Sequence, residues 1–162
     1  DVIYIYDSYS VRQEAVPIHA SAIKARGMFI PVIWPMDGRQ ADKGSGKSLT
    51  EQYRTEGVNM TREHFTNPPQ QGQKDHTGGI SVEAGIQEMY TRFQTNRLKI
   101  FNNQGRLLEE MRMYHRKDGK IVAKNDDVIS AMRYAVMSVR RARVKNYEPT
   151  QIFSDSEFSV FN

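Results

Sequence analysis

Three aspartates occupy positions where a chain of alternating strands and helices commonly places its chemistry. Asp37 comes just after an apolar run that ends at Trp34, and Asp126 and Asp127 begin a long amphipathic segment. In open α/β sheets the carboxyl ends of the strands and the loops that follow them carry the functional groups. Phosphodiester hydrolysis by two metal ions needs several hard oxygen ligands around ions about 3.5–4 Å apart. Asp37, Asp126 and Asp127 are therefore candidate metal ligands.

The same aspartates also have a purely structural interpretation. An Asp at the start of a helix most often caps backbone N–H groups, and Asp126–Asp127 taken alone fits that role better than catalysis. Two adjacent carboxylates repel each other unless a cation lies between them. The metal-site interpretation gains weight because Asp37 and the pair can converge at one end of a sheet.

Other kinds of active site find little support in the sequence. There is no cysteine and no G-x-S-x-G motif, and none of the four histidines stands in a zinc-binding arrangement. Gly44–Ser48 resembles the end of a P-loop, but Ala41 stands where that motif needs its first glycine. We therefore expect neither a nucleophilic hydrolase nor a zinc hydrolase, and we disfavour nucleotide binding.

Charge gives weak support for a polyanionic partner. The formal net charge is +4 and the isoelectric point is about 9.3. The loop after Asp37 is basic and could lie along a DNA backbone. A solvated basic helix face explains the charge about as well. Much of the excess lies late in the chain, in Arg133, Arg140, Arg141, Arg143 and Lys145.

The first sixty residues predict the start of an α/β domain. Val2–Tyr6 is β-branched and aromatic throughout and predicts a strand buried on both faces, followed by a helix over Pro17–Arg26. Phe29–Trp34 predicts a second strand, parallel to the first. A helix over Ser48–Glu56 and a short strand over Val58–Met60 follow.

The second half of the chain predicts further helices around one more strand. A long polar loop spans residues 64–79, and Ser81 caps a helix that has apolar residues at helical spacing as far as Phe93. Leu98–Phe101 predicts a strand, Leu107–Tyr114 a helix, and Lys117–Lys120 a tight turn between extended segments.

The last predicted helix starts near Asp126 and has one apolar face. Its polar residues, Ser130, Arg133, Arg140 and Arg141, lie elsewhere on the circumference. The apolar face consists of residues three or four apart: Val128, Met132, Ala135, Val136 and Val139.

Length and composition predict one soluble domain with a tail. The 162 residues are 38% hydrophobic and 26% charged, and no apolar run approaches the roughly 20 residues that cross a bilayer. We expect a domain over residues 1–146 and an extended C-terminal tail over 147–162. The opening at Asp1 is neither an initiator Met nor a signal peptide, which indicates a cut within a longer polypeptide.

The late part of the chain resembles the closing part of phage terminase large subunits. In that family a Glu- and Tyr-bearing segment, here Leu108–Tyr114, precedes an Asp-rich helix start, here Asn125–Ala135. The helix continues in a D-A-x-R-Y-like way, with Ser130 in place of the usual Asp. Trp34–Gly38 and the basic loop after it are similar to the family's middle portion.

This resemblance spans roughly residues 2–143 and implies a fold. It implies an α/β domain with an RNase H-like mixed central sheet flanked by helices. Val2–Tyr6 then corresponds to the third strand, which implies that the first strands, and the family's first catalytic Asp, precede Asp1. Asp7 is the nearest carboxylate left in this chain.

The resemblance also implies an activity and its residues. The family's nuclease cuts concatemeric double-stranded DNA before and after headful packaging, with Mg²⁺ or Mn²⁺ as a pair of ions. Asp37 matches the second acidic position and Asp126 or Asp127 the third, so all three are expected to be catalytic and metal-binding. The candidates for binding DNA phosphates are Arg39, Lys43 and Lys47, for which ordinary solvated charge is an equally good explanation.

The implied partners are those of a viral packaging motor in the host cell cytoplasm during phage assembly. They are double-stranded DNA, an N-terminal ATPase domain of the same polypeptide, the portal protein and the terminase small subunit, with no membrane. The aromatic tail suits docking to the portal. Two alternatives stay open: a non-catalytic DNA-binding or portal-docking module, and another RNase H-like nuclease of the resolvase or integrase type.

Overall fold

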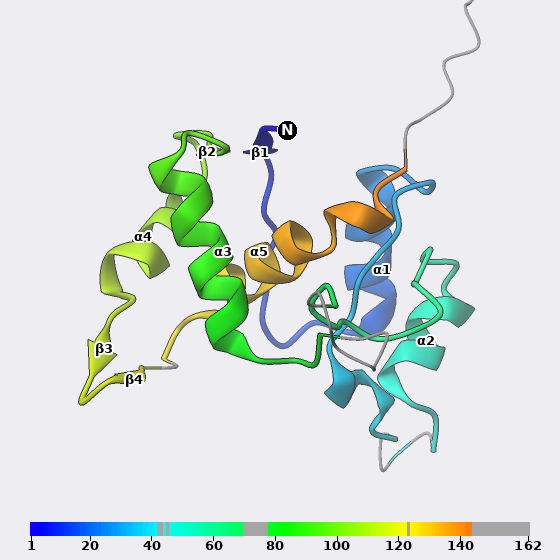
Figure 1. Cartoon of the computed structure of the whole chain (residues 1–162). Helices are drawn as coiled ribbons and strands as arrows, with labels where there is room; N and C mark the ends of the chain where they lie inside the picture. Colours follow the sequence, from blue (N-terminus) through cyan, green and yellow to red (C-terminus); the bar gives the residue numbers. More distant parts are fainter. Residues whose placement is uncertain (42–43, 45, 70–77, 123, 144–162) are drawn as a thin grey trace, which may run out of the picture.

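Helix α5, over Asp127–Met137, lies near the centre of the molecule, with the other helices around it (Figure 1). The computed structural model describes residues 1–41, 44, 46–69, 78–122 and 124–143. Among these residues no helix is long and apolar enough to span a membrane. The predicted tail over 147–162 lies outside the described residues.

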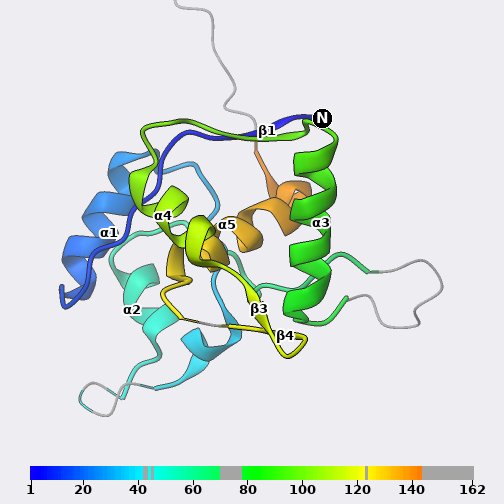
Figure 2. The same cartoon turned by 90° about the vertical axis from the view of Figure 1, so that its left-hand side faces the viewer.

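Two short strands form a parallel sheet along one side of α5 (Figure 2). Strand β1 is Ile3–Ile5 and β2 is Leu98–Ile100, with Ile3 opposite Leu98. Both strands were predicted, but the expected burial of β1 on both faces was wrong. Ile3 and Ile5 pack against the core, whereas Tyr4 between them is exposed. The strand alternates because only one of its faces meets the helices.

The predicted strand over Phe29–Trp34 was largely wrong. In the described residues this segment forms a single parallel bridge, between Val32 and Met60. The expected strand at Val58–Met60 is likewise reduced to that bridge. β1 pairs instead with β2, far along the chain. A β-branched run has no stable extended form without a neighbour for its backbone groups, and here that neighbour is one residue long.

The helices of the first half follow the predicted boundaries closely. Helix α1 covers Val16–Ala25, and α2 covers Leu49–Thr55. Ser48 and Glu51 form a capping box at the start of α2, each side chain accepting the other's backbone N–H. The short 3-10 helix η1, over Met36–Arg39, lies between α1 and α2 in the chain and contacts α2.

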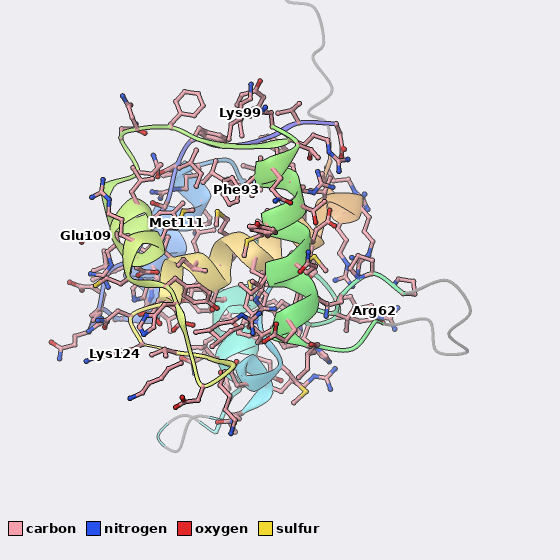
Figure 3. All side chains as sticks on the ribbon, turned by 60° about the vertical axis from the view of Figure 1, so that its left-hand side comes forward. Arg62, Phe93, Lys99, Glu109, Met111 and Lys124 are labelled. Carbon is pink, nitrogen blue, oxygen red and sulfur yellow. The ribbon has the colours of Figure 1, made fainter. Side chains whose placement is uncertain are left out.

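Helices α3 and α4 pack on the opposite side of α5 from α1 and α2 (Figure 1). Helix α3 covers Val82–Gln94 and α4 covers Gly105–Met113, and both confirm predicted helices. Phe93 of α3 and Met111 of α4 turn toward each other, while Glu109 points outward (Figure 3).

The predicted turn at Lys117–Lys120 is the tip of a small hairpin. It joins β3, Arg116–Lys117, to the antiparallel strand β4, Lys120–Ile121. Arg116 donates to both carboxylate oxygens of Glu83, at 2.9 Å for Nη1, and this ion pair ties the hairpin to α3.

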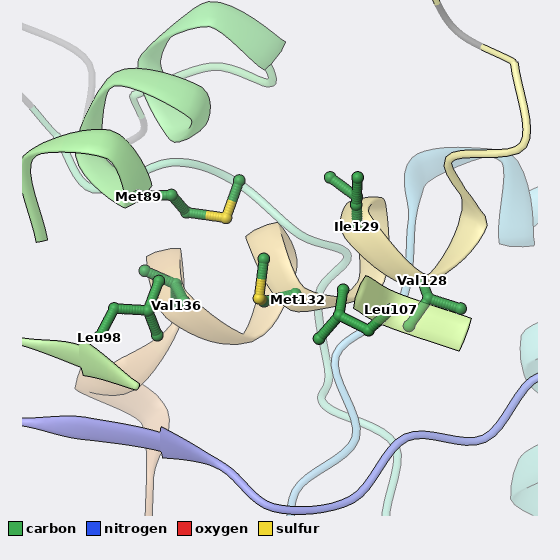
Figure 4. Packing of buried hydrophobic residues seen from close by; sticks show 7 residues of the cluster. All are labelled: Met89, Leu98, Leu107, Val128, Ile129, Met132 and Val136. Carbon is green, nitrogen blue, oxygen red and sulfur yellow. The ribbon is translucent and has the colours of Figure 1, made fainter. Parts of the chain in front are cut away.

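The main core forms where α3, α4 and β2 meet α5 (Figure 4). The predicted apolar face of α5 was right for Val128, Met132 and Val136. Ala135 is exposed, and Val139 is exposed in the 3-10 helix η2, Val139–Arg141, because α5 ends at Met137. The buried cluster comprises Met89, Leu98, Leu107, Val128, Ile129, Met132 and Val136.

Arg133 departs most from the predicted pattern. It was expected on the polar side of the last helix, yet it is 4% exposed. Its guanidinium lies 4.5 Å from the ring centre of Tyr134 and 5.4 Å from that of Phe65. Gly85 of α3 makes the room, since a Cβ there would lie 2.5 Å from the Arg133 Cγ. The aromatic faces favour the buried cation electrostatically.

Candidate functional site

Asp37 lies in the first turn of η1, and its position is fixed by the residues around it. Gly38 is buried, and its carbonyl accepts a 2.8 Å hydrogen bond from the Thr50 hydroxyl of α2. A Cβ on Gly38 would lie 3.0 Å from that hydroxyl and 3.1 Å from the Trp34 ring. Trp34 is anchored in turn by its indole N–H, which donates to the Thr61 carbonyl at 2.9 Å. This packing leaves Asp37 exposed at the rim of a cavity of about 590 Å³.

Asp126 and Asp127 are adjacent but have different surroundings. Asp126 is the N-cap residue of α5, where its side chain caps no described N–H group and only its carbonyl accepts from Ser130, at 2.8 Å. Burial raises the pKa of Tyr114, and the negative charge of Asp126 raises it further. Asp127 lines a second cavity of about 590 Å³ and forms an exposed 3.5 Å ion pair with Arg12.

A buried carboxylate caps α5 from another helix. The side chain of Glu110, in α4, is fully buried, and its Oε2 accepts from the backbone N–H groups of Val128 at 2.8 Å and Ile129 at 3.1 Å. Arg106 donates to the other oxygen at 3.1 Å. The first N–H groups of a helix lack partners within it, and the helix dipole favours a negative charge there. Glu110 therefore fixes the helix start that carries Asp127.

Asp37 and Asp127 border cavities that share a wall. Ile33 and Pro35 line both cavities, so Asp37 and Asp127 border adjacent cavities. Among the described residues, no three His, Asp or Glu side chains come together closely enough to hold one ion. The structure thus brings Asp37 and Asp127 to neighbouring cavities, whereas Asp126 lines neither of them in the described residues.

The predicted phosphate-binding residues are only partly described. Arg39 is exposed at the end of η1, and Lys47 is exposed just before the Ser48 cap of α2. Both residues follow Asp37 in the chain and precede α2. Lys43 lies outside the described residues.

Sequence patterns did not single out Glu110 as a functional residue. The i, i+4 spacing of Arg106 and Glu110 was the available signal, but such pairs usually lie on a helix surface. Only the packing of α4 on α5 shows that this one is buried.

Comparison with known proteins gives concordant matches. The family model for the terminase RNaseH-like domain matches residues 1–139. The terminase large subunit of Salmonella phage P22 is 39% identical over 145 residues, which cover 89% of this chain and 28% of that protein. That of Enterobacteria phage LP7 is 39% identical over 138 residues, which cover 85% of this chain and 27% of that protein. The chain thus spans under a third of these relatives.

A solved structure agrees with the sequence matches. The nuclease domain of the P22 large terminase superposes with a TM-score of 0.75 at 40% identity, over 88% of this chain and 70% of that one. The likeness confirms the predicted α/β fold of RNase H-like type. Nuclease domains of that fold generally use divalent metal ions.

Proposed function

The chain belongs to the terminase RNase H-like domain family, and from this premise we propose that it is the DNA-cutting domain of a viral packaging motor. The activity is metal-dependent endonuclease cleavage of concatemeric double-stranded DNA during headful packaging. The observation that carries the proposal is the position of Asp37 and Asp127, on cavities that share Ile33 and Pro35.

The chain's own residues have separate tasks in this reaction. Asp37, Asp126 and Asp127 would supply hard oxygen ligands, and Asp127 lines the cavity next to that of Asp37. Glu110 holds the start of α5 in place. Arg39, Lys43 and Lys47 bind DNA phosphates without choosing sequence.

Asp37, Asp126 and Asp127 would hold two Mg²⁺ or Mn²⁺ ions. Bound divalent ions lower the pKa of a water and stabilise the leaving oxygen. Carboxylates suit these ions, but the described residues lack a three-ligand group. We therefore propose that oxygens from DNA, water or further residues of the polypeptide would supply the ligands that the described residues lack.

The partners follow from the same family membership. We propose that the domain works with an N-terminal ATPase domain of the same polypeptide, the terminase small subunit and the portal protein, in the host cell cytoplasm. Residues 147–162 are the proposed segment for docking to the portal.

Cleavage of supercoiled plasmid with Mg²⁺ or Mn²⁺ tests the nuclease. The chain, and any longer natural polypeptide that contains it, is compared with its Asp37→Asn, Asp126→Asn and Asp127→Asn variants. Asp118→Asn is the matched control, because Asp118 is exposed in the β3–β4 turn and Asn tolerates its positive φ of 49°. We expect the Asp37 and Asp127 substitutions to abolish cleavage and the Asp118 substitution to leave it unchanged.

The opposite results are equally informative. Metal-dependent cleavage that survives Asp37→Asn and Asp127→Asn would place the active site elsewhere. DNA binding without cleavage in every form tested would instead favour the non-catalytic binding module.

A further inference from the structure

Three arginines gather around a polar cavity at the end of the last helix. Arg62, Arg141 and Arg143 line this cavity of about 430 Å³, which we name the arginine cleft. The remaining lining comes from Pro31, the segment Asn59–Thr61 and Glu63. Arg62 and Arg143 are exposed and Arg141 is half-buried. The cleft therefore presents guanidinium groups to solvent from two parts of the chain.

Neighbouring hydrogen bonds hold the cleft in shape. Arg140 donates to the Met137 carbonyl at 2.6 Å and to the Thr66 carbonyl at 2.9 Å, which joins η2 to the segment after Arg62. Arg141 makes a long contact, 3.5 Å, with the Glu63 carbonyl. These bonds use backbone oxygens, so they position the arginines without neutralising them.

The cations in this region are crowded. Burial lowers the pKa of Arg140, and the adjacent charge of Arg141 lowers it further. In the described part of the chain, no carboxylate forms an ion pair with Arg62, Arg141 or Arg143, although Glu63 lines the same cavity. The repulsion between like charges that form no ion pair is relieved when an anion binds among them.

The arginine cleft adjoins the cavity that Asp127 lines. Pro31, Arg141 and Arg143 line both of them, and Asp127 lies in the second. Two adjoining cavities therefore carry a carboxylate suited to a metal ion and a group of guanidinium ions suited to phosphate. A nucleic-acid backbone presents phosphates at regular intervals, so it can engage both kinds of group at once.

We propose that Arg62, Arg141 and Arg143 bind successive phosphates of the DNA strand whose cleaved phosphate lies near Asp127. This inference rests on the proposed function and names a DNA-contacting surface separate from the loop after Asp37. Guanidinium groups suit phosphate because they donate in a planar fork. The contacts are to the backbone, so they set affinity and register and not sequence preference.

Binding of a short labelled DNA duplex, measured by fluorescence anisotropy in EDTA over a range of KCl concentrations, tests the proposal without cleavage. Arg62→Gln, Arg141→Gln and Arg143→Gln are each expected to weaken binding about threefold to tenfold at low salt. Each should also reduce the slope of log affinity against log salt by about 1. Two duplexes of unrelated sequence should lose affinity equally.

Arg112→Gln is the matched control. Arg112 is exposed on α4, and Figure 3 shows that helix, through Glu109 and Met111, on the side of the molecule opposite Arg62. Its substitution should change neither affinity nor slope. The unfolding midpoints of all four variants should match that of the unsubstituted chain. Three of the four side chains are exposed and Arg141 is only half-buried, so each substitution removes few packing contacts.

The results separate this proposal from the nuclease itself. If the three cleft variants keep the affinity and the salt slope of the unsubstituted chain, the proposed role of the cleft is contradicted, even when Asp37→Asn and Asp127→Asn abolish cleavage. A chain that binds no duplex at low salt would overturn it as well. If the cleft variants lose affinity but cleavage survives both aspartate substitutions, the arginine cleft is supported as a DNA-binding surface and the proposed active site is contradicted.

Discussion

Glu110 is the side chain on which the start of α5 most depends. Its removal in Glu110→Ala leaves two buried N–H groups and Arg106 without their acceptor. Unpaired buried groups of this kind cost about 3 kcal/mol, and we expect that loss in the free energy of unfolding measured with urea. Glu110→Gln should lose less, about 1–2 kcal/mol, because an amide oxygen still accepts.

The neighbouring Glu109→Ala variant is the control for Glu110. Glu109 is exposed and points away from the core (Figure 3), so its loss should change stability by less than about 0.5 kcal/mol. A Glu110→Ala variant as stable as Glu109→Ala would show that the cap does not hold α5.

At the residue scale, the place of a side chain relative to a predicted strand or helix was a better guide to candidate site residues than its residue type. Asp37 and Asp127 were predicted as site residues because they follow or begin an element, and each lines a cavity in the structure. Glu110 and Arg133 were missed because a charge in an amphipathic helix is expected in solvent. Their burial depends on contacts with other helices, which no local pattern contains.

Gly85 tests how closely α3 packs on α5. Gly85→Ala adds about 1 kcal/mol of helix propensity but places a methyl group against the buried Arg133 side chain. Overpacking of this kind costs about 1–3 kcal/mol, so we expect a net loss of about 1 kcal/mol in the free energy of unfolding.

A double-mutant cycle isolates that clash. In an Arg133→Ala background the same Gly85→Ala change should be neutral or stabilising by up to about 1 kcal/mol. Gly105→Ala is the control, because a Cβ there meets no described atom within 4 Å. Equal effects of Gly85→Ala in both backgrounds would contradict the proposed contact.

The ion pair between the β3–β4 hairpin and α3 should respond to acid. The hydrogen bond that Arg116 donates to Glu83 lowers the pKa of the Glu83 carboxyl below its ordinary value. A lowered folded-state pKa means that the stabilisation is present above the unfolded value and disappears as pH falls through the folded one. NMR titration should therefore show an acid-shifted Glu83 midpoint that Arg116→Gln returns to normal. An unshifted midpoint in the unsubstituted chain would contradict the ion pair.

At the element scale, helices were predictable and strand pairing was not. The capping box of Ser48 and Glu51 and the spacing of Val128, Met132 and Val136 are local, and the helices formed where predicted. A strand depends on a partner that can be remote. β1 pairs with β2 across most of the chain, whereas Phe29–Trp34 has only one bridged residue.

For the whole molecule, the arrangement around α5 explains why the site is spread over several elements. η1 provides Asp37, α5 provides Asp127, and α4 provides the cap that fixes α5. Sequence patterns identify each element, but their arrangement around α5 follows from helix packing. The candidate site therefore depends on two sets of contacts. The contact of α2 with η1 holds Asp37, and the cap from α4 holds the start of α5 next to Asp127.

Divalent ions should stabilise the folded molecule if Asp37 and Asp127 bind them. With a dissociation constant on the order of 1 mM, 10 mM Mn²⁺ adds about 1.4 kcal/mol and raises the unfolding midpoint by roughly 3 °C. EDTA should reverse the shift, and Asp37→Asn and Asp127→Asn should each remove it, while Asp118→Asn should retain it. Arg12→Gln should increase the shift slightly, because the exposed Arg12 cation competes for the Asp127 carboxylate. An equal shift in all variants would mean that the ions bind elsewhere on the surface.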